Sequence, residues 1–499
     1  LPSSNIPLAK LLIRMPAALA TMRAPLLAAL SGRAPVSRRC SAAALGIGTH
    51  PPRGLLPWYM SPFSSQHARG WGGRRACSSL AAVGPAPFST DGEPALILGI
   101  ETSCDDTGAA VVSSDGRVLG DALASQLEIH APWGGVVPKL AMRAHADNID
   151  RVVDEALRAA GVAPSELTAV AVTVGPGLSL CLRVGVLKAR QIAAAAQVPL
   201  VPVHHMEAHA LVARLAAGAG GVEFPFVALL VSGGHNLLLL VRGVGSYTLL
   251  GTTIDDAVGE AYDKTARLLG LDLSRGGGPA LEAAALEGDD KRFRFSVPMR
   301  QERNKTCDFS YAGLKTATRM CIERELGLVE EVAGEVAPRA LEGEELQAQR
   351  DIAAGFQTVA VKHLEERTSR AVGWALEEEP AIRSLVVAGG VACNKVVRAR
   401  LEAVAQTHGL ALVCPPPGLC TDNGVMVAWT GVERFALGLS EPPPAAVEGE
   451  DAHVDLRPRW PLGEKDARAI QKARGLKAAR QHTNLTELTE ADLDALGRD

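Results

Sequence analysis

The chain has 499 residues, of which 47% are hydrophobic and 21% are charged, values typical of a globular protein with two domains or two large lobes. The sequence has no uninterrupted apolar stretch of about eighteen residues, which argues against a transmembrane helix. Its nine cysteines form no CxxC pair, which argues against a zinc ribbon and a disulfide framework.

Residues 1–90 differ in composition from the rest of the chain. They contain no Asp or Glu, but ten Lys and Arg among many Ser, Ala and Pro. Such a segment is typical of an organellar transit peptide, although a disordered extension has the same composition. We therefore expect an organellar protein, in a mitochondrion with a plastid as the alternative, although this composition does not decide between the two organelles. All 55 acidic residues but only 41 of the 51 basic ones follow position 90, so the body carries about −14. This charge argues against a broadly basic nucleic-acid binder.

The pattern after position 94 predicts two α/β lobes in succession. In the first lobe, 95–223, we expect strands at 96–101, 108–113, 117–125, 169–174 and 200–203, with helices at 142–160 and 189–196. In the second lobe, 224–439, we expect strands at 226–232, 236–242, 246–251, 385–388 and 410–413, with helices at 257–269, 312–326, 352–376 and 425–437. The repeated order predicts two related lobes with a ligand cleft between them.

Three segments fall outside this repeat. The acidic stretch 329–349 has no clean apolar stripe, and we interpret it as a surface insertion in the second lobe. We assign the helix near 422–438 to the second lobe, with packing against the first lobe as the alternative. Residues 440–499 are expected to be a loosely attached tail, within which 457–462 are candidates for docking.

A histidine pair follows the predicted strand 200–203. If a helix begins at His205, then His205 and His209 share one face and can bind one metal ion. A polar helix start with satisfied histidines is the alternative. Asp422 is either an N-cap of the helix that follows it or a third ligand beside the histidines. The order of residues is not HExxH, which disfavours a zincin-type protease.

Three glycine turns lie in the second lobe. They are Ser232-Gly233-Gly234, the Gly389-Gly390 junction and the flexible turn 276–279. Such turns let backbone N–H groups approach a phosphate, although a plain hairpin uses the same residues. Together they indicate a nucleotide cleft. The sequence has neither GxxxxGK[ST] nor GxGxxG, so we expect neither a P-loop nor a dinucleotide fold.

Acidic pairs occur in both lobes. Asp105-Asp106 lies in the first turn of the first lobe, and Asp255-Asp256 begins the predicted helix that contains Asp263. Turn formation or helix capping accounts for either pair. Capping does not account for Asp263, because it lies inside the helix.

Eight stretches occur in order along residues 96–439 and together resemble one family. They are GIETSCDDT (99–107), GGVVP (134–138), HHMEAH (204–209), LVSGGH (230–235), IDDAVGEAYDKTA (254–266), DFSYAGLKTA (308–317), VVAGGVACN (386–394) and CTDN (420–423). The pattern resembles the tRNA N6-adenosine threonylcarbamoyltransferase family, the TsaD group with its archaeal and mitochondrial relatives. Unlike bacterial members, this chain has Lys139 where Glu is common and Cys393 in place of a small residue.

The resemblance implies an actin-like/sugar-kinase (ASKHA) fold of two RNase H-like lobes. It implies transfer of the threonylcarbamoyl group of threonylcarbamoyl-AMP to N6 of adenosine 37 in tRNAs that read ANN codons, with release of AMP. It further implies one divalent metal ion, Fe or Zn, and three sets of site residues. The metal ligands are His205, His209 and Asp422; the nucleotide-binding residues are Leu230, Val231, Ser232, Gly233, Gly234, Asp263, Gly278, Glu282 and Asn394; and the acidic pair is Asp105 and Asp106.

The resemblance also implies partners. We expect tRNA as substrate, a homodimer that pairs through residues 178–190, a separate synthase that supplies threonylcarbamoyl-AMP, and no membrane. The basic clusters 292–305 and 183–190 are either tRNA contacts or solvated surface. Three alternatives remain: a metallopeptidase that uses Glu207, an actin-like ATPase or sugar kinase, and a regulatory subunit without transferase activity of its own.

Overall fold

A computed structural model describes residues 93–130, 135–218, 221–301, 305–328, 341–445 and 454–469. All of these residues belong to one compact unit, Ser78–Asp499. The predicted transit peptide 1–90, Gly134 of the second motif, residues 329–340 of the insertion and much of the tail (446–453 and 470–499) lie outside the described residues. No helix within the described ranges combines the length and apolar character needed to cross a membrane.

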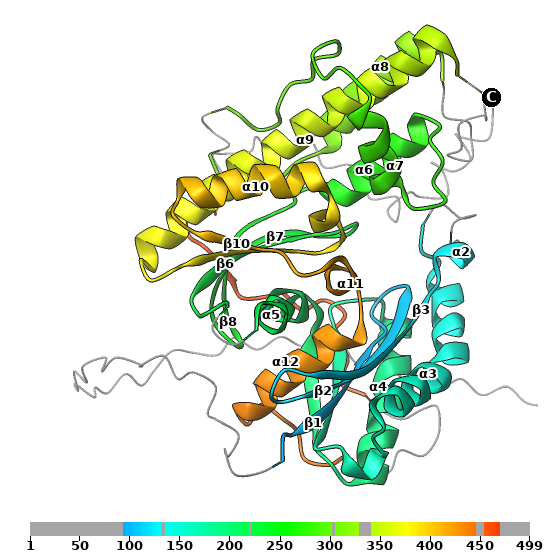
Figure 1. The fold of residues 1–499 in the computed structure, drawn as a ribbon, viewed down its shortest axis with the longest axis vertical. Coiled ribbons are helices and arrows are strands. Elements are labelled where there is room, and N and C mark those ends of the chain that lie inside the picture. Colours follow the sequence, from blue (N-terminus) through cyan, green and yellow to red (C-terminus); the bar gives the residue numbers. More distant parts are fainter. Residues whose placement is uncertain are drawn as a thin grey trace, which may run out of the picture. The chain divides into compact units, whose positions relative to one another are not determined.

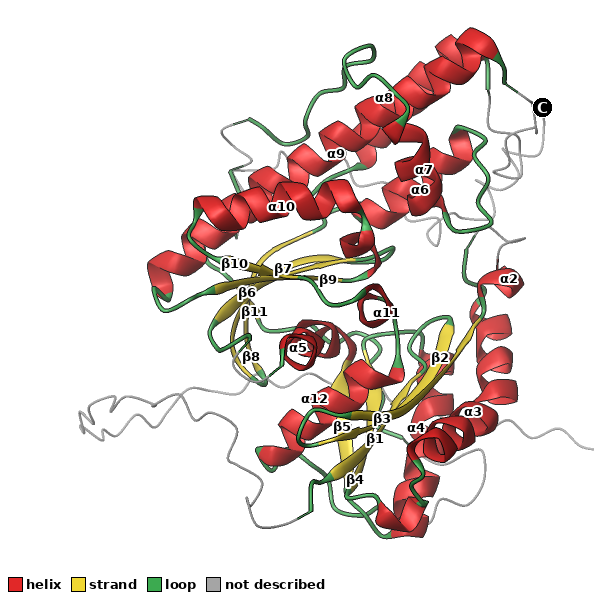
Figure 2. Cartoon of the chain, viewed as in Figure 1, coloured by secondary structure: helices red, strands yellow, loops and turns green. Residues whose placement is uncertain are grey.

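The first lobe is built on a five-stranded sheet in the order β3-β2-β1-β4-β5 (Figures 1 and 2). Its strands are β1 (Leu96–Glu101), β2 (Asp106–Ser113), β3 (Val118–Ser125), β4 (Ala169–Gly175) and β5 (Leu200–His204). β1 pairs antiparallel with β2 and parallel with β4. Because successive side chains of β1 point to opposite faces, Leu98 packs toward α3 (Pro138–Ala160) and α4 (Ser179–Ala196), whereas Ile97 packs toward α12 (Gly424–Ala436).

The second lobe repeats this arrangement in a six-stranded sheet of order β10-β9-β6-β7-β8-β11. Its strands are β6 (Phe226–Val231), β7 (Asn236–Gly243), β8 (Ser246–Thr252), β9 (Ser384–Ala388), β10 (Ala411–Val413) and β11 (Glu464–Lys465). β6 pairs antiparallel with β7 and parallel with β9, as β1 does with β2 and β4. The duplicated order and directions confirm the predicted α/β fold of two related, actin-like lobes.

Helices cover both faces of the second sheet (Figure 2). The larger core lies between the sheet and α6 (Val258–Leu268), α7 (Gly277–Leu286), α8 (Ala312–Leu326), α9 (Gly343–Glu378) and α10 (Lys395–Thr407). The other face packs against α5 (His205–Ala217). The shorter helices are α2 (Leu127–His130), α11 (Pro417–Cys420) and the 3₁₀ turns η4 (Pro164–Glu166) and η6 (Gly390–Cys393).

Several predicted boundaries are wrong, and three of the differences change how a segment is interpreted. α4 begins at Ser179 rather than at 189. Its first half contains Gly185, which weakens the helical pattern of the sequence. In the structure this glycine allows close packing, since a Cβ there would lie 2.4 Å from Thr102 Oγ1. α9 begins at Gly343, so residues 343–349 of the predicted insertion form its first two turns, and Ala348 is buried there. The flexible turn predicted at 276–279 opens α7, and Gly276 is its N-cap.

α12 belongs to the second half of the chain but packs on the first sheet. Small residues make this approach close: a Cβ at Gly99 would lie 2.2 Å from the amide nitrogen of Ala428, and a Cβ at Gly108 would lie 2.7 Å from that of Gly424. Side chains at these positions would force the helix away from β1 and β2. The first turn of α12 is therefore fixed against the start of β2.

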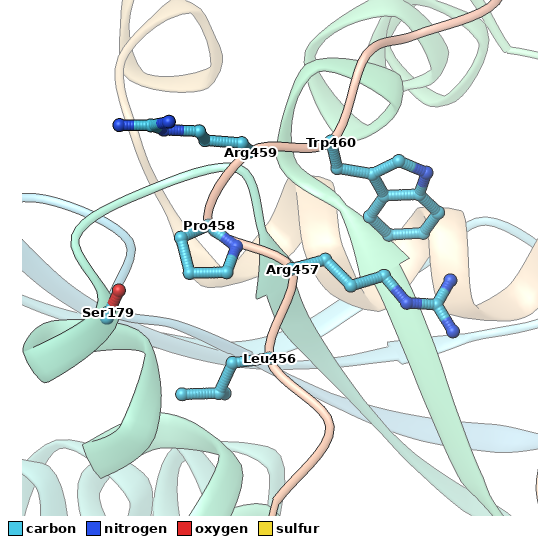
Figure 3. A pocket seen from close by; sticks show the side chains of 6 residues that line it. All are labelled: Ser179, Leu456, Arg457, Pro458, Arg459 and Trp460. Carbon is cyan, nitrogen blue, oxygen red and sulfur yellow. The ribbon is translucent and has the colours of Figure 1, made fainter. Parts of the chain in front are cut away.

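Residues 454–469 contact both lobes. The Arg457 amide donates to the carbonyl oxygen of Val174 (2.8 Å), while β11 pairs parallel with β8. The ring of Trp460 lies 4.7 Å from the ring of His204, and its carbonyl oxygen is 2.9 Å from His204 Nε2. Residues 456–460 and Ser179 line an open pocket of about 530 Å³ (Figure 3). This part of the predicted tail is thus docked.

Candidate metal centre and nucleotide cleft

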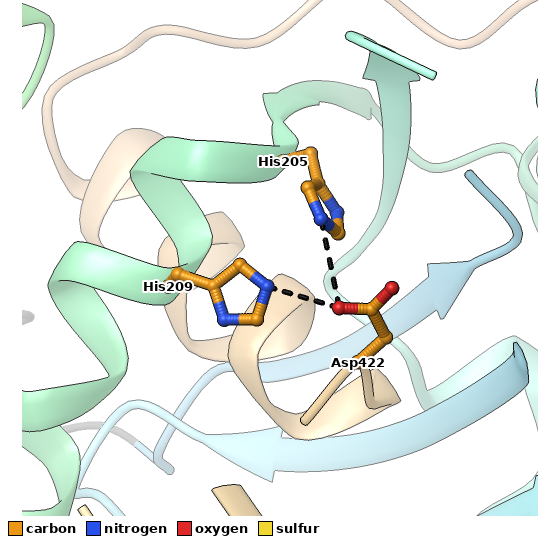
Figure 4. Close-up of side chains that lie close together, drawn as sticks. All are labelled: His205, His209 and Asp422. Atoms are coloured by element: carbon orange, nitrogen blue, oxygen red, sulfur yellow. Dashed lines mark hydrogen bonds and ion pairs between the residues drawn. The ribbon is translucent and has the colours of Figure 1, made fainter. Parts of the chain in front are cut away.

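The predicted metal ligands lie together where α5 meets the segment before α12. His204 caps α5, since its Nδ1 accepts a hydrogen bond from the Met206 amide (3.1 Å). α5 therefore begins at His205, and the rings of His205 and His209 meet edge to face with centroids 4.8 Å apart. Asp422 Oδ1 lies 3.0 Å from His209 Nε2 and 3.6 Å from His205 Nε2 (Figure 4).

Asp422 is not the cap of the helix that follows it. That role belongs to Asn423, whose Oδ1 accepts a hydrogen bond from the Met426 amide (2.8 Å). The Asp422 carboxylate is thus available to the histidines. Burial alone would raise the pKa of Asp422, but His205 and His209 outweigh it and hold this pKa below its usual range.

Two residues that the sequence did not single out support His205. Its Nδ1 lies 3.1 Å from Ser103 Oγ and 3.3 Å from Glu101 Oε2, and Thr173 Oγ1 donates to the same carboxylate oxygen (2.5 Å). These contacts turn His205 Nε2 toward Asp422. Burial alone would lower the pKa of His205, but Asp422 and Glu101 outweigh it and raise this pKa to about 9. The signal in the sequence was a carboxylate at the end of the apolar strand LILGIE.

The donor set fits one divalent metal ion. Zinc at about 2.0–2.1 Å from tetrahedral N and O ligands places those ligands roughly 3.3 Å apart. The two separations from Asp422 Oδ1, 3.0 Å and 3.6 Å, bracket that value, and the three ligand atoms lie within 4.8 Å of one another. Two imidazoles and one carboxylate suit Fe or Zn and leave coordination positions for a substrate.

The predicted acidic pair lies at the same end of the first sheet. Asp106 is the first residue of β2, and its Oδ1 is buried without a hydrogen-bond partner. The close approach of Gly108 to Asn423 places the start of β2 beside the segment that carries Asp422. Burial raises the pKa of Asp106 to about 7, assisted by Asp105 and Asp422 and opposed by a hydrogen bond from Ser125.

The glycine turns of the second lobe pack side by side. The Gly259 amide at the start of α6 donates to the Ser232 carbonyl oxygen (3.3 Å), and a Cβ at Gly259 would lie 2.6 Å from that oxygen. Gly389 has a φ of +97°, and a Cβ there would lie 2.3 Å from the Val231 carbonyl oxygen. Gly233 and Gly234 are exposed, with open space around both Cβ positions. The structure thus joins two of the predicted turns, while Leu230 and Val231 are buried strand residues behind them.

The remaining predicted nucleotide residues surround these turns. The Gly278 amide donates to Asp263 Oδ1 (3.1 Å), and the Lys395 amide donates to Glu282 Oε1 (2.8 Å). Asn394 is the N-cap of α10, and its Nδ2 donates to Gln357 (3.0 Å), so both ends of its amide are engaged within the protein. Asp263 is therefore tied to the start of α7, and Glu282 is tied to the start of α10.

Asp255 and Asp256 have structural partners. α6 begins at Val258 with Ala257 as its N-cap, so the pair does not begin this helix as expected. Asp255 Oδ1 instead accepts hydrogen bonds from the Tyr311 and Ala312 amides at the start of α8 (2.8 and 3.3 Å). Asp256 pairs with Lys315.

His235, which the sequence analysis did not select as a site residue, lies at the end of the glycine turn between β6 and β7. Its amide donates to Ser232 Oγ (3.1 Å), so it closes the glycine turn between β6 and β7. Burial lowers the pKa of His235 to about 4, and the charges of His205 and His209 contribute to this lowering.

Glu207 does not fit the metallopeptidase alternative. Its carboxylate is 1% exposed and accepts hydrogen bonds from the Gly245 amide (2.9 Å), Tyr247 Oη (2.8 Å) and Arg434 Nη1 (2.8 Å). A water-activating acid must face the metal, whereas this carboxylate joins α5 to α12 and to the β7–β8 turn.

Comparisons with known proteins show the family to which the chain is similar. Residues 117–429 match the family model described as tRNA N6-adenosine threonylcarbamoyltransferase. The chain is 55% identical over 397 residues to the probable mitochondrial tRNA N6-adenosine threonylcarbamoyltransferase of Arabidopsis thaliana, covering 80% of this chain and 81% of the relative. It is 47% identical over 391 residues to the enzyme of that name from Brucella ovis, covering 77% and 99%.

Among solved structures, the chain is similar to HypF of T. kodakarensis, with 15% identity and a TM-score of 0.43 over 69% of this chain and 48% of that one. The match to the family model and the two sequence relatives identify the family. The chain belongs to the tRNA N6-adenosine threonylcarbamoyltransferase family, and it is an acyltransferase of tRNA modification.

Proposed function

We propose that this chain transfers the threonylcarbamoyl group of threonylcarbamoyl-AMP to N6 of adenosine 37 in tRNAs that read ANN codons. The observation that carries the proposal is the cluster of His205, His209 and Asp422, whose ligand atoms lie within 4.8 Å of one another. In the reaction, a bond forms between N6 and the carbamoyl carbon, the bond from that carbon to the phosphate oxygen breaks, N6 loses a proton, and AMP leaves.

The second lobe would hold the nucleotide part of the donor. The exposed backbone of Gly233, Gly234 and Gly390 suits a phosphate. Asp263 and Glu282 suit the ribose hydroxyls as hydrogen-bond acceptors. When bound by His205, His209 and Asp422, a divalent metal ion would neutralise the charge that develops as AMP leaves.

The first lobe would supply the group that accepts the proton lost by N6. Asp106 has an unpartnered oxygen and a pKa raised to about 7, which suits a general base near neutral pH. Its neighbour Asp105 would orient the adenosine amine. Because both acids lie beside the segment that carries Asp422, acceptor and donor would meet at the end of β1.

The proposed tRNA contact lies on the first lobe. Several cations of the two predicted clusters are already paired: Arg292 with Asp351 (3.0 Å), Arg300 with Glu366, and Lys188 with Asp150 (2.7 Å). Arg459 makes no ion pair among the described residues, and it lines the open pocket of residues 456–460 and Ser179 (Figure 3). We place a tRNA phosphate there.

The assembly and location are also part of the proposal. We expect a homodimer that pairs through residues 178–190, where Leu180 is 41% exposed, and a separate synthase that supplies threonylcarbamoyl-AMP. A mitochondrial location is supported by the composition of residues 1–90 and by the mitochondrial name of the Arabidopsis relative.

Reconstitution tests this function. The purified chain without residues 1–90 is loaded with Zn²⁺ or Fe²⁺ and incubated with threonylcarbamoyl-AMP and unmodified mitochondrial tRNA, and the nucleosides are analysed by mass spectrometry. We expect threonylcarbamoyladenosine at position 37 without any other protein. Folded, metal-loaded protein that forms no product would contradict transfer by this chain alone, and product at another position would contradict the assigned substrate.

A further inference from the structure

A buried histidine lies beneath the acidic turn of the first lobe. His145 belongs to α3 and is fully buried, and both of its ring nitrogens contact the turn. Its Nε2 lies 3.0 Å from the Cys104 carbonyl oxygen, and its Nδ1 lies 2.8 Å from Thr107 Oγ1. These two residues directly flank Asp105 and Asp106 in the sequence. The imidazole therefore bridges the two ends of the acidic turn.

The partners of the imidazole determine which nitrogen carries the hydrogen. A carbonyl oxygen only accepts hydrogen bonds, so Nε2 carries the hydrogen and donates it to Cys104. Burial lowers the pKa of His145 and outweighs the Cys104 hydrogen bond and the nearby carboxylates, which oppose this shift. The ring is therefore neutral, and Nδ1 accepts the hydroxyl hydrogen of Thr107. Each nitrogen thus has a defined role at one end of the turn.

The backbone of the turn is held by three donors in succession. The Ser103 carbonyl oxygen accepts a hydrogen bond from the Leu178 amide (2.8 Å), and the Asp105 carbonyl oxygen accepts one from the Gln126 amide (3.1 Å). The imidazole supplies the donor to the carbonyl oxygen between them. Two of these donors belong to the backbone, whereas the third is a side chain that a substitution can remove.

The contact with Thr107 also bears on the direction of Asp106. Thr107 shares a face of β2 with Ala109, which packs in the core beneath α3. Asp106 therefore shares the opposite face with Gly108, which approaches the Asn423 backbone. Asp106 Oδ1 is buried without a hydrogen-bond partner, so the place of this atom depends on the strand that carries it. Fixing that strand end fixes the carboxylate.

We propose that His145 is a positioning residue of the transfer reaction, which holds the turn of Asp105 and Asp106 in the arrangement that receives the adenosine amine. This inference rests on the proposed function. His145 is too deeply buried to touch a substrate, and it acts through the turn. Without its imidazole, the Cys104 carbonyl oxygen and the Thr107 hydroxyl lose a partner, and the turn relaxes toward water. Alignment of the amine is then lost, while the metal ligands and the glycine turns are unchanged.

The kinetics of two variants test this role in the full metal-loaded chain. His145→Ala removes both hydrogen bonds, whereas His145→Gln keeps an amide donor that reaches the place of Nε2. We expect His145→Ala to lower kcat at least about tenfold and to change KM for threonylcarbamoyl-AMP less than about twofold, because alignment is lost and donor binding is not. His145→Gln should recover most of the lost kcat. A glutamine variant as slow as His145→Ala would overturn the role assigned to the Cys104 contact.

His363→Ala is the matched control for the loss of a buried histidine. His363 is also fully buried on a helix, α9, and its Nε2 accepts a hydrogen bond from the Ser310 amide (3.2 Å). Both alanine variants should lower the melting temperature, but His363→Ala should keep the wild-type kcat. An equal fall of kcat in the two variants would show a general loss of stability and overturn the positioning role.

Hydrogen exchange measured by mass spectrometry follows the turn without any transfer. We expect residues 101–107 to exchange faster in His145→Ala than in the wild type, with α5 unchanged, and His145→Gln to resemble the wild type. This pattern in a chain whose wild type forms no product would contradict only the proposed function. Unchanged exchange in the turn, or an unchanged kcat in His145→Ala, would overturn the positioning role.

Discussion

The two lobes share one strand order but carry different chemistry in the corresponding turn. The turn between β1 and β2 holds Asp105 and ends at Asp106, whereas the turn between β6 and β7 holds Ser232, Gly233 and Gly234. The acids suit an amine and its proton, and the glycines suit a phosphate. The duplicated sheet provides two equivalent edges, and in the proposed function a few turn residues assign each edge its substrate.

The helices that join the lobes do not follow the duplication. α5 follows a strand of the first lobe but packs on the second sheet, and α12 follows the second lobe but packs on the first sheet. Glu207 and Arg434 fasten the two helices together through a buried ion pair (2.8 Å). The proposed metal ligands lie in the first turns of α5 and just before α12, so this one ligand set depends on both lobes.

The largest effect is expected when the metal ligands that join the lobes are removed. His205→Ala/His209→Ala should lower the transfer rate at least ~1000-fold, because several kcal/mol of charge stabilisation in the transition state is lost. Elemental analysis and mass spectrometry of the nucleosides measure metal and product together. His408→Ala is the matched control; full activity in the metal-free double variant would contradict a role for the metal.

A slightly smaller effect is expected from the acidic turn of the first lobe. Asp106→Asn should lower kcat about 10²–10³-fold if this carboxylate takes the proton. Since its pKa is raised to about 7 and the ionised form is the base, the wild-type rate should rise between pH 6 and pH 8.

Asp105→Asn serves as the control for that pH profile: it should keep the rise but move it to lower pH, because Asp105 helps to raise the pKa of Asp106. An Asp106→Asn profile that still rises near pH 7 would show that another group is the base. The raised pKa also favours the protonated carboxyl in the folded state, so this group contributes stability at low pH that is lost as pH rises through 7.

An intermediate effect is expected from the glycine turns of the second lobe. Gly389→Ala introduces a side chain at a φ of +97° and 2.3 Å from the Val231 carbonyl oxygen, at a cost of about 1–3 kcal/mol in the free energy of unfolding. We expect AMP to bind about tenfold more weakly in calorimetry. Gly390→Ala has open space at its Cβ and should bind AMP normally; equal affinity in both variants would contradict the assignment of this turn.

The smallest effect is expected at the tRNA contact of the first lobe. Arg459→Ala should weaken tRNA binding a few-fold and reduce the slope of log affinity against log salt by about 1. Filter binding at several salt concentrations measures both quantities. Arg158→Ala, at the far end of α3, is the control, and identical slopes for the two variants would place the contact elsewhere.

Local features of the sequence predicted much of the fold. The apolar periodicity gave β1 and α8 at their observed bounds, and the four-residue spacing placed His205 and His209 on one face. Long-range packing was harder to predict, because two of the strands on which α12 packs, β1 and β2, lie more than 300 residues earlier in the chain. The start of α4 was missed because its glycine serves packing against Thr102 rather than a turn.

The supporting residues of the site were the least predictable. Glu101, Ser103 and His235 belong to strand ends and turns whose composition is ordinary, and their importance appears only where those ends meet His205. Asp422 could not be separated from a helix cap by sequence, since only the structure shows that Asn423 caps α12.

The most direct test of the central claim measures whether the metal of one edge touches the nucleotide of the other. The protein is loaded with Mn²⁺ as a spectroscopic substitute and saturated with AMP, and the coupling of the Mn²⁺ electron spin to ³¹P is recorded by electron–nuclear double resonance. The account predicts a strong ³¹P coupling that disappears in His205→Ala/His209→Ala. If Mn²⁺ is bound and AMP is saturating but no ³¹P coupling is observed, the metal and the nucleotide occupy separate sites. That result would contradict a single active site shared by the lobes.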